Sequence, residues 1–409
     1  MKVLLAHNYY GSAAPSGENL VFEAEKAMLQ AHGHSVYTFT RHSDEIRLQG
    51  TWGTLKGALA TPWNPWTAAA IRRVVDRTQS EVVHVHNTFP LLSPAIFPGI
   101  AGRAPKVLTL HNYRLMCPAA ILLRQGQVCT QCLDQKSVLP AVRHGCYRRS
   151  RMATVPIALN VALHHAVGTW QHYVDAFVAL TDFQRQTLVA AGLPAHKVFV
   201  KPNFYPGNPE PTPWAQRQPY AVFVGRLTEE KGLVGLLQAW ALGASRGMSL
   251  PTLRIVGDGP LRARLEAMAP NLPVTFCGQL PAAEAQAQIA QAELLVLPSE
   301  CFEGFPMVVR EAFAFGTPAA VSNLGPLPSI VQAGVSGVLF EPANPESLAR
   351  AVATAWNTPG LLRQMGSGAH QAYLTHYTEQ ANYKQLMSIY QAAIENHRQT
   401  QIHTHGRAI

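Results

Sequence analysis

The chain has 409 residues, of which 47% are hydrophobic and 14% are charged. This length and composition exclude a disordered tail and a small disulfide scaffold, and they allow two hydrophobic cores. The formal net charge of +9 is unevenly divided. Lys and Arg outnumber Asp and Glu by ten over residues 1–204, whereas Asp and Glu outnumber Lys and Arg by one over residues 205–409. The front half is therefore expected to meet an anionic partner or surface, and acidic substrates, membrane headgroups and nucleic acid all fit that description.

The amino terminus has no export-signal pattern, because the apolar run after Lys2 is too short for a signal core. Residues 152–170 form the longest apolar-leaning stretch, but Pro156, Asn160, His164 and His165 interrupt it, so we expect no membrane-spanning helix there. Six cysteines in a chain without a signal indicate a reducing compartment. We therefore expect a cytoplasmic protein, at most bound to the inner face of the membrane.

Short apolar runs alternate with helical patterns along the first 200 residues. The apolar spacing over residues 19–32 predicts a helix that ends at Gly33. Predicted strands cover residues 2–6, 35–39, 82–86, 107–110 and 176–179. Strands separated by helices pair in parallel, so we expect a doubly wound α/β sheet.

Six prolines mark residues 202–219 as a linker. Beyond it the alternation restarts, with predicted strands at 220–224, 253–256, 274–276, 294–297 and 319–321 and predicted helices at 232–242, 261–269, 284–290 and 308–315. We therefore predict two Rossmann-like domains, over residues 1–201 and 220–378. Residues 379–409 are expected to form a last helix, which folds back across the linker to the first domain, and a tail.

One segment of the second half combines carboxylates with a helix start. Gly304 permits close backbone approach, and Pro306 suits the first turn of a helix, whose free amides bind anions or hydroxyl-rich ligands. Glu303 precedes that helix and Glu311 lies eight residues further on, so both can face the ligand crevice at the carboxyl end of the sheet. Such carboxylates indicate a sugar or a ribose, although each alone is also explained as a solvated glutamate near a helix start.

A second segment closes the first strand of this half and opens a helix. Gly225 allows a tight turn, and Arg226 and Lys231 place two cations at the carboxyl end of the sheet. A diphosphate fits this pair through the forked guanidinium and the point charge of the ammonium. Ion pairs within the turn, to Glu229 and Glu230, explain the segment alone equally well.

Together the two segments resemble the donor domain of glycosyltransferase family 4, whose members are retaining enzymes with the GT-B fold, in which two Rossmann-like domains face a central cleft. The resemblance covers nearly the whole chain and points to a bacterial polysaccharide-type member. The matching positions are Gly225 and Arg226, Glu230 to Gly232, Val256 to Leu261, Glu303, Glu311, and Gly334 to Phe340, the last as a glycine-containing turn.

This resemblance implies roles for individual residues. It implies that Arg226 and Lys231 hold the donor diphosphate and that Glu311 binds the ribose hydroxyls. The donor sugar would be held by Glu303 and by the backbone of Gly304, Phe305 and Pro306. The loop formed by Gly278, Gln279 and Leu280 would lie beside the base. The catalytic residues would be Glu303, His111, Arg226 and Lys231.

The front domain matches the family less closely. Gly11 and Gly17 occupy the family's glycine-rich first loop, but Glu18 follows Gly17 where a second glycine is common, and the choice between the two stays open. His111 matches the family histidine beside the donor sugar, although a lone histidine at a strand end is more often a hydrogen-bonded structural residue. His86 is a weaker candidate, for the acceptor side of the cleft.

One later segment departs from the family pattern. Residues 324–329 replace a common Gly-Gly-Glu run, so that Pro326 removes a backbone donor and Ser329 removes a carboxylate. A contact to the donor is therefore missing or supplied from elsewhere.

Four cysteines fall within 30 residues, and two of them have the spacing of a thiolate knuckle: Cys117, Cys129, Cys132 and Cys146. Four thiolates satisfy a tetrahedral structural zinc, which would give the insertion at about residues 117–146 a core. Reduced thiols in a packed loop are the alternative. No Asp-x-Asp motif for a nucleotide-bound metal occurs, so we expect catalysis that needs no cofactor.

Four arginines lead into the apolar stretch: Arg143, Arg148, Arg149 and Arg151. Basic residues before an apolar segment place proteins on anionic bilayers. The alternative is a buried helix with a core stripe made of Val155, Leu159, Ala162 and Ala166.

We predict a metal-independent, retaining hexosyltransferase that moves a sugar from a nucleotide diphospho-sugar to an acceptor hydroxyl. We expect the acceptor to be a glycan or a lipid-linked glycan of cell-surface, exopolysaccharide or lipopolysaccharide assembly. No basic module with interleaved aromatics points to nucleic acid. Two alternatives are a non-catalytic GT-B-like scaffolding subunit and a dinucleotide oxidoreductase, although Gly257 to Gly259 lacks the third glycine of a dinucleotide motif.

Overall fold

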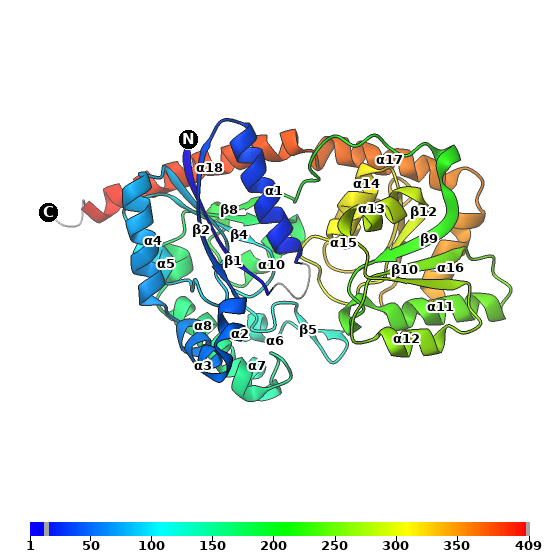
Figure 1. Cartoon of the computed structure of the whole chain (residues 1–409), viewed down its shortest axis with the longest axis horizontal. Helices are drawn as coiled ribbons and strands as arrows, with labels where there is room; N and C mark the ends of the chain where they lie inside the picture. Colours follow the sequence, from blue (N-terminus) through cyan, green and yellow to red (C-terminus); the bar gives the residue numbers. More distant parts are fainter. Residues whose placement is uncertain (12–15, 406–409) are drawn as a thin grey trace. The chain divides into compact units, whose positions relative to one another are not determined.

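The computed structural model describes residues 1–11 and 16–405, without the side chains of residues 403–405. The chain divides into two compact units. The first comprises Met1–Leu122, Thr130–Pro202 and Asn382–Ile409, and the second comprises Leu123–Cys129 and Asn203–Ala381. Each unit is built around its own six-stranded sheet (Figure 1).

The sheet of the first unit is parallel throughout and has the strand order β2-β1-β3-β4-β7-β8. Its inner strands are buried on both faces, which explains their near-continuous apolar sequences. The strands are β1 (Lys2–Tyr9), β2 (Ser35–His42), β3 (Val82–Asn87), β4 (Lys106–Leu110), β7 (Ala176–Ala179) and β8 (Val198–Val200). The strand order reverses between β1 and β3, so their carboxyl ends mark the place where such sheets bind ligands.

The other elements of residues 1–202 are mostly helices. They are α1 (Gly17–Ala31), α2 (Asp44–Leu48), α3 (Gly50–Ala60), α4 (Pro65–Thr78), α5 (Ile96–Gly99), α6 (Gln131–Asp134), α7 (Leu139–His144), α8 (Arg151–Ala166), α9 (Thr169–His172), α10 (Asp182–Ala190) and the 3-10 turn η1 (Ala195–Lys197). A short hairpin joins β5 (Leu123–Arg124) to β6 (Gln127–Val128). The last helix, α18 (Glu379–His405), belongs to the first unit from Asn382 onward.

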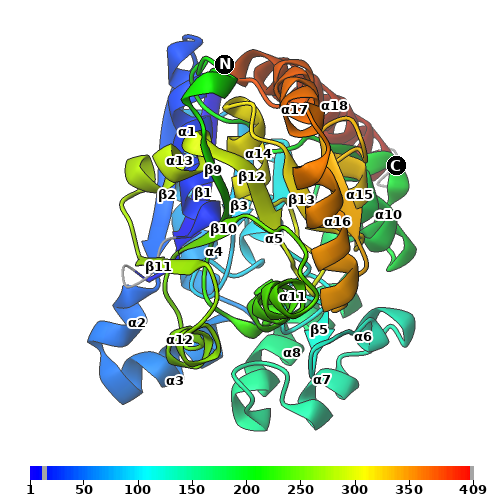
Figure 2. The ribbon, with the colours of Figure 1, turned by 90° about the vertical axis from the view of Figure 1, so that its right-hand side faces the viewer.

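The second unit repeats the architecture with the strand order β11-β10-β9-β12-β13-β14. Its strands are β9 (Gln218–Val224), β10 (Thr252–Val256), β11 (Val274–Gly278), β12 (Ala292–Leu297), β13 (Ala319–Ser322) and β14 (Gly337–Phe340). Its helices are α11 (Leu233–Ser245), α12 (Arg262–Met268), α13 (Ala282–Gln291), α14 (Met307–Ala314), α15 (Leu327–Ile330), α16 (Pro345–Asn357) and α17 (Leu361–His376), with 3-10 turns η2 (Trp214–Gln216) and η3 (Glu229–Lys231). Helices α11, α12 and α16 cover one face of this sheet, and α13, α14 and α17 cover the other (Figure 2).

The predicted fold class, two doubly wound parallel α/β units, is confirmed. Every predicted strand is present, most of them longer by a few residues at one end. Strands β8 and β14 and the two strands of the hairpin, β5 and β6, were not predicted. The segment Gly334 to Phe340, interpreted as a turn, ends in β14 (Gly337–Phe340), which pairs with β13.

Helix α8 does not bury the stripe that a core helix would bury. Val155 and Leu159 are 47% and 53% exposed, and Ala162 and Ala166 are exposed as well, so the predicted core stripe is wrong. The buried face of α8 instead carries small and polar residues as well as apolar ones; for example, His164 lies within hydrogen-bonding distance of the Pro62 carbonyl. Among the helices that the structure describes, none is long and apolar enough to cross a membrane.

Candidate donor-binding and catalytic site

Two glycines bring the loops at the carboxyl end of the second sheet together. Gly232 lies directly before α11 with a φ of 68°, and a Cβ there would lie 1.9 Å from the carbonyl oxygen of Pro298. Gly257 follows β10 with a φ of 135°, and its Cβ would lie 1.9 Å from the carbonyl oxygen of Gly225. Since only glycine fits at either position, the loops after β9, β10 and β12 converge on one edge.

At this edge Glu303 and Lys231 form an ion pair. Glu303 Oε1 accepts hydrogen bonds from Lys231 Nζ at 2.7 Å and from Ser299 Oγ at 2.5 Å. Burial disfavours both charges, but the pairing outweighs it, so the pKa of Glu303 is lowered and the pKa of Lys231 is raised. Both groups are therefore charged at neutral pH. Because the two bonds use the same oxygen, Oε2 takes part in neither and is available to accept from a ligand hydroxyl.

Arg226 lies on the same loop in a more open position. Its side chain is 66% exposed, and its Nη2 lies 3.5 Å from Glu230 Oε1, which also accepts a hydrogen bond from Thr228. The sequence allowed ion pairs within this turn, and Arg226 forms one with Glu230. Lys231 pairs with Glu303 instead. An exposed ion pair at this distance is weak, so Arg226 can exchange Glu230 for a phosphate at little cost.

The other predicted donor residues of this unit lie on the adjoining loops and helix. Pro306 caps α14, and Phe305 is buried against the ring of Tyr377. Glu311 lies within α14, where burial raises the pKa of its carboxyl and Arg310, 3.6 Å away, opposes that shift. Gly278 ends β11, and its carbonyl accepts a hydrogen bond from Gly257. Gln279 and Leu280 follow Gly278, and Gly304 precedes Phe305.

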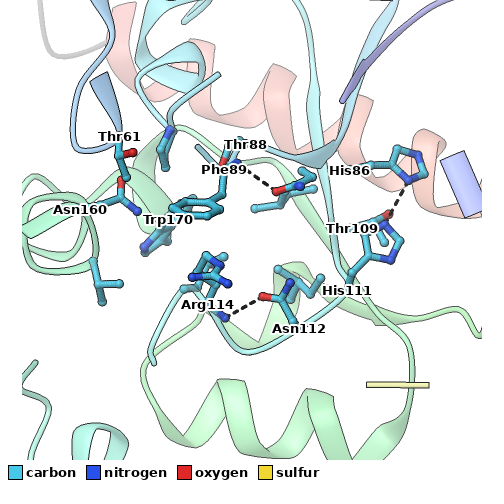
Figure 3. A pocket seen from close by; sticks show the side chains of 16 residues that line it. Thr61, His86, Thr88, Phe89, Thr109, His111, Asn112, Arg114, Asn160 and Trp170 are labelled. Atoms are coloured by element: carbon cyan, nitrogen blue, oxygen red, sulfur yellow. Dashed lines mark hydrogen bonds between the residues drawn. The ribbon is translucent and has the colours of Figure 1, made fainter. Parts of the chain in front are cut away.

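In the first unit, His111 follows β4 and is linked to a buried carboxylate. His111 Nε2 lies 3.2 Å from His86 Nδ1, and His86 Nε2 lies 3.1 Å from Glu25 Oε1. Figure 3 shows His86, on β3, and His111, just after the neighbouring strand β4, at the wall of a pocket. Burial lowers the pKa of His86 to about 4 and lowers that of His111 well below its usual value, so both rings are neutral at pH 7.

This geometry fixes the tautomer of His111. Glu25 is ionised and only accepts, because burial, which raises its pKa, is outweighed by Lys201 and the histidines. His86 must then donate through Nε2, which leaves its Nδ1 as an acceptor for His111 Nε2–H. The remaining nitrogen of His111, Nδ1, is therefore unprotonated and can accept a hydrogen bond from a sugar hydroxyl.

The buried end of this chain is closed by a lysine. Lys201 Nζ lies 2.9 Å from Glu25 Oε2 and 3.0 Å from Asn382 Oδ1, and it is 1% exposed. His84 Nδ1 lies 2.9 Å from Glu25 Oε1. The ligand atoms of Glu25, His84 and His86 are close enough to hold a metal ion, but the ammonium of Lys201 already neutralises the carboxylate, so a divalent ion does not fit this group.

The pocket beside His111 is small, and both polar and apolar side chains line it. Its volume is about 40 Å³, which is room for a water molecule but not for a sugar ring. Arg114 lies over the ring of Phe89 at 4.3 Å and faces this pocket together with Asn160 and Trp170 (Figure 3). At its edge Asn112 Nδ2 donates to Glu18 Oε1 at 2.8 Å, and burial raises the pKa of Glu18.

Four of these residues were not singled out from the sequence: Glu18, Glu25, Arg114 and Lys201. For Glu25 a signal existed, because it occupies the apolar face of α1 between Phe22 and Met28, where a charge needs a buried partner. Lys201 directly follows β8, and no sequence pattern marks it. Of the two predicted loop glycines, Gly11 lies next to Asp44 and Gly17 begins α1, while residues 12–15 between them lie outside the described residues.

The predicted zinc site at the four cysteines stays a prediction. Among the side chains that the structure describes, the four cysteines belong to no group of three or more ligand atoms within 4.8 Å of one another. Cys117 is buried in the turn between Tyr113 and Ala120, Cys132 lies in α6 and Cys146 follows α7.

Two family models match the chain in succession. Residues 18–206 match the model described as Glycosyltransferase Family 4, and residues 206–372 match the model described as Glycosyl transferases group 1. The chain is 33% identical over 207 residues to an exopolysaccharide phosphotransferase of Streptomyces coelicolor, covering 48% of this chain and 21% of that protein. It is 28% identical to a 2-deoxystreptamine glucosyltransferase of Streptomyces kanamyceticus over 74% of this chain and 76% of that protein.

The chain thus spans only a fifth of the Streptomyces coelicolor relative, and 45% of an uncharacterized glycosyltransferase of Methanocaldococcus jannaschii that is 31% identical over 42% of this chain. Among solved structures, HepE of Anabaena in complex with UDP and glucose has a TM-score of 0.63 at 16% identity, covering 95% of this chain and 99% of that one. A sucrose-phosphate synthase of Thermosynechococcus elongatus has a TM-score of 0.67 at 18% identity, covering 95% and 98%. With both halves matching consecutive models of one enzyme group, this chain belongs to the family 4 glycosyltransferases of the GT-B fold.

Proposed function

We propose that this protein transfers a sugar from a nucleotide diphospho-sugar to an acceptor hydroxyl. The observation that carries the proposal is the Lys231–Glu303 pair, which places a fixed cation beside a carboxylate oxygen at the ligand-binding edge of the second unit. The exposed Arg226 on the same loop adds a second cation. One carboxylate with two cations suits a diphosphate joined to a hydroxyl-rich ring, and the complex of HepE with UDP and glucose is consistent with that ligand class.

In this proposal the residues of the second unit act on the donor. Departure of the nucleotide diphosphate develops negative charge, which Lys231, Arg226 and the amides at the start of α14 stabilise. Glu303 accepts hydrogen bonds from the sugar hydroxyls, and Glu311 accepts them from the ribose. Gly278, Gln279 and Leu280 border the base. Gly304, Phe305 and Pro306 offer backbone contacts to the sugar.

In the first unit, neutral His111 accepts a sugar hydroxyl through Nδ1 and thereby positions the donor. Gly11 and Gly17 flank the loop that approaches the phosphates. We propose transfer with retention, in which the acceptor attacks from the face that the diphosphate leaves and the leaving phosphate takes its proton. Each of these steps uses side chains of this chain and the substrates, so the proposed hexosyl transfer is metal-independent.

We propose a glycan or lipid-linked acceptor of cell-surface polysaccharide assembly at the cytoplasmic face of the membrane. The exopolysaccharide relative and the fold shared with a lipopolysaccharide outer core galactosyltransferase, WaaB (16% identity, TM-score 0.60), support this placement. The excess of ten positive charges in residues 1–204 fits an acceptor that carries phosphates.

A panel of nucleotide sugars tests the proposal. Thermal shift identifies the donor that stabilises the full chain, and NMR then follows the anomeric configuration of its hydrolysis or transfer product. We expect one donor class to bind and the product to retain configuration, and Arg226→Ala to lose most turnover while keeping the fold. No binding by any nucleotide sugar would contradict the activity, and an inverted product would contradict only the retaining mechanism.

A further inference from the structure

Helix α3 buries its glycines and exposes its large apolar residues. Its buried residues are Gly53 and Gly57, which pack against Ile46 of α2 so closely that a Cβ would lie 2.1 Å from the Ile46 carbonyl oxygen or 2.7 Å from Ile46 Cδ1. Trp52, Leu55 and Leu59 are 71%, 51% and 70% exposed. A helix that packs only against the core of its own unit buries its large apolar residues. The apolar face of α3 is therefore directed at a partner outside the unit.

Helix α8 repeats this arrangement. Met152, Val155 and Leu159 have the same three- and four-residue spacing as the exposed residues of α3, and they are 87%, 47% and 53% exposed. Residues at this spacing share one helix face. Helices α3 and α8 contact each other within the first unit (Figure 1).

The segments that carry these two helices contain basic residues and no acidic residue. No Asp or Glu occurs in residues 46–75 or in residues 135–174, whereas these segments hold nine Lys and Arg. Lys56 and Arg73 are exposed, and among the described residues neither makes an ion pair. Two copies of this chain facing each other here would bring like charges together, so the charge disfavours self-association and matches an anionic surface.

A groove adjoins the stripe of α3. It has a volume of about 920 Å³ and lies among α2, α3 and α4, with Leu59, Trp63 and Trp66 as apolar lining and Lys56 and Arg73 as cations. Trp66 is 78% exposed. Tryptophan and leucine beside lysine and arginine form the composition that lies in the interface of a bilayer, with indoles at the depth of the headgroups.

We propose that the outer faces of α3 and α8 dock the first unit on an anionic lipid bilayer, with the two apolar stripes among the acyl chains and the flanking cations on the headgroups. This deepens the proposed function, because it rests on a lipid-linked acceptor and names the surface that reaches it. Residues 52, 55 and 59 of α3 and residues 152, 155 and 159 of α8 supply the apolar contact. Lys56, Arg73, Arg148 and Arg151 supply the electrostatic attraction.

Flotation of the full chain with vesicles tests the docking surface. We expect binding to vesicles of phosphatidylcholine with 30% phosphatidylglycerol, about tenfold weaker binding to phosphatidylcholine alone, and release by high salt. The triple variant Trp52→Ser, Leu55→Ser, Leu59→Ser should bind at least about tenfold more weakly. Leu374→Ser, which changes a leucine of similar exposure in α17 of the second unit, is the matched control and should bind like the wild type.

Two further measurements keep the test independent of folding and of the proposed activity. The double charge reversal Lys56→Glu, Arg73→Glu changes only exposed side chains and should also weaken binding to anionic vesicles. Donor hydrolysis, measured without lipid, should be unchanged in every variant, so a failure of the transferase proposal is seen separately. Equal vesicle binding by the wild type and both variants would overturn the inference, as would a wild-type dimer in light scattering that the triple variant dissociates.

Discussion

Both units contain a largely buried glutamate that is paired with a lysine, Glu25 with Lys201 and Glu303 with Lys231, but the surroundings of these two pairs differ. Glu25 in the first unit is completely buried, and both of its oxygens are engaged by Lys201, His84 and His86. Glu303 in the second unit has a side chain that is 12% exposed, and its bonds to Lys231 and Ser299 use a single oxygen. A carboxylate whose oxygens are both bonded by side chains of its own unit orients those side chains. A carboxylate with an unused oxygen near solvent is available to a ligand. Substitutions and titrations can separate these two roles.

Replacing the buried carboxylate should have the largest effect on folding. Glu25→Gln leaves Lys201 charged and buried without a counter-ion, so we expect the free energy of unfolding to fall by about 3–5 kcal/mol in urea titrations. Asp76→Asn, which removes a partly exposed carboxylate paired with Arg103, is the control and should cost less than about 1 kcal/mol. The double variant Glu25→Gln, Lys201→Met removes both charges of the pair. If it is no more stable than Glu25→Gln alone, the unpaired charge of Lys201 is not the cause of the lost stability.

Removing Lys231, which is paired with Glu303 near solvent, should mainly affect turnover. Lys231→Ala removes a cation from the proposed leaving diphosphate, so kcat should fall about 10²–10³-fold. The free energy of unfolding should also fall, because Glu303 loses its counter-ion, but by less than in Glu25→Gln, because Glu303 is closer to solvent. Arg246→Ala removes a partly exposed arginine paired with Glu346 and should keep full activity. A variant that is as active as the wild type would exclude Lys231 from the donor site.

Acid should weaken the buried network of Glu25 and His86 before it weakens the Lys231–Glu303 pair. The pKa of His86 is lowered to about 4 in the folded protein, from an ordinary value of 6.5, so the unfolded chain binds the extra proton first. Stability from this residue is complete above pH 6.5 and is lost towards pH 4, by about 1 kcal/mol per pH unit within that window. Urea titrations over pH 4–7 measure the slope, and His86→Gln should flatten it. An unchanged slope in that variant would mean that other groups carry the acid sensitivity.

The smallest effect is expected at the ribose. Glu311→Gln keeps a hydrogen-bonding side chain, so we expect about a tenfold rise in KM for the nucleotide sugar with kcat nearly unchanged. A donor whose ribose lacks the 2′-hydroxyl should show a smaller difference between the wild type and this variant. Glu346→Gln, on the exposed helix α16, should behave as the wild type. An equal loss with both donors would place Glu311 away from the ribose.

The tautomer of His111 shows whether the buried Glu25 orients this ring for its proposed contact with the sugar. Nitrogen-15 spectra of labelled histidines distinguish a ring protonated at Nε2 from one protonated at Nδ1. His111 should carry its proton on Nε2 in the wild type, and this preference should weaken in Glu25→Gln if that variant folds. The same result in both proteins would show that Glu25 has no part in orienting His111.

Much of the second unit was predictable because its chemistry is local in sequence. The alternation of short apolar runs with helical spacing specified the parallel sheet, and Gly225 to Gly232 and Glu303 to Pro306 sit where strands end and helices begin. Residue type and position after a strand are enough to place a side chain at the ligand edge of such a sheet. The partner of Lys231 was not predictable, because Glu229 and Glu230 are its neighbours in the chain while Glu303 is its neighbour in space.

The sequence by itself determined the α/β architecture with two parallel sheets and the uneven charge, since periodicity and composition are properties of the chain. Only the tertiary structure decided that Glu25, His86, His111 and Lys201 form one buried network, because their side chains come from α1, β3, the loop after β4 and the end of the first domain. It also decided that α3 and α8 turn their apolar stripes outward. Periodicity shows that a helix has an apolar face, but the direction of that face depends on which neighbours the fold supplies.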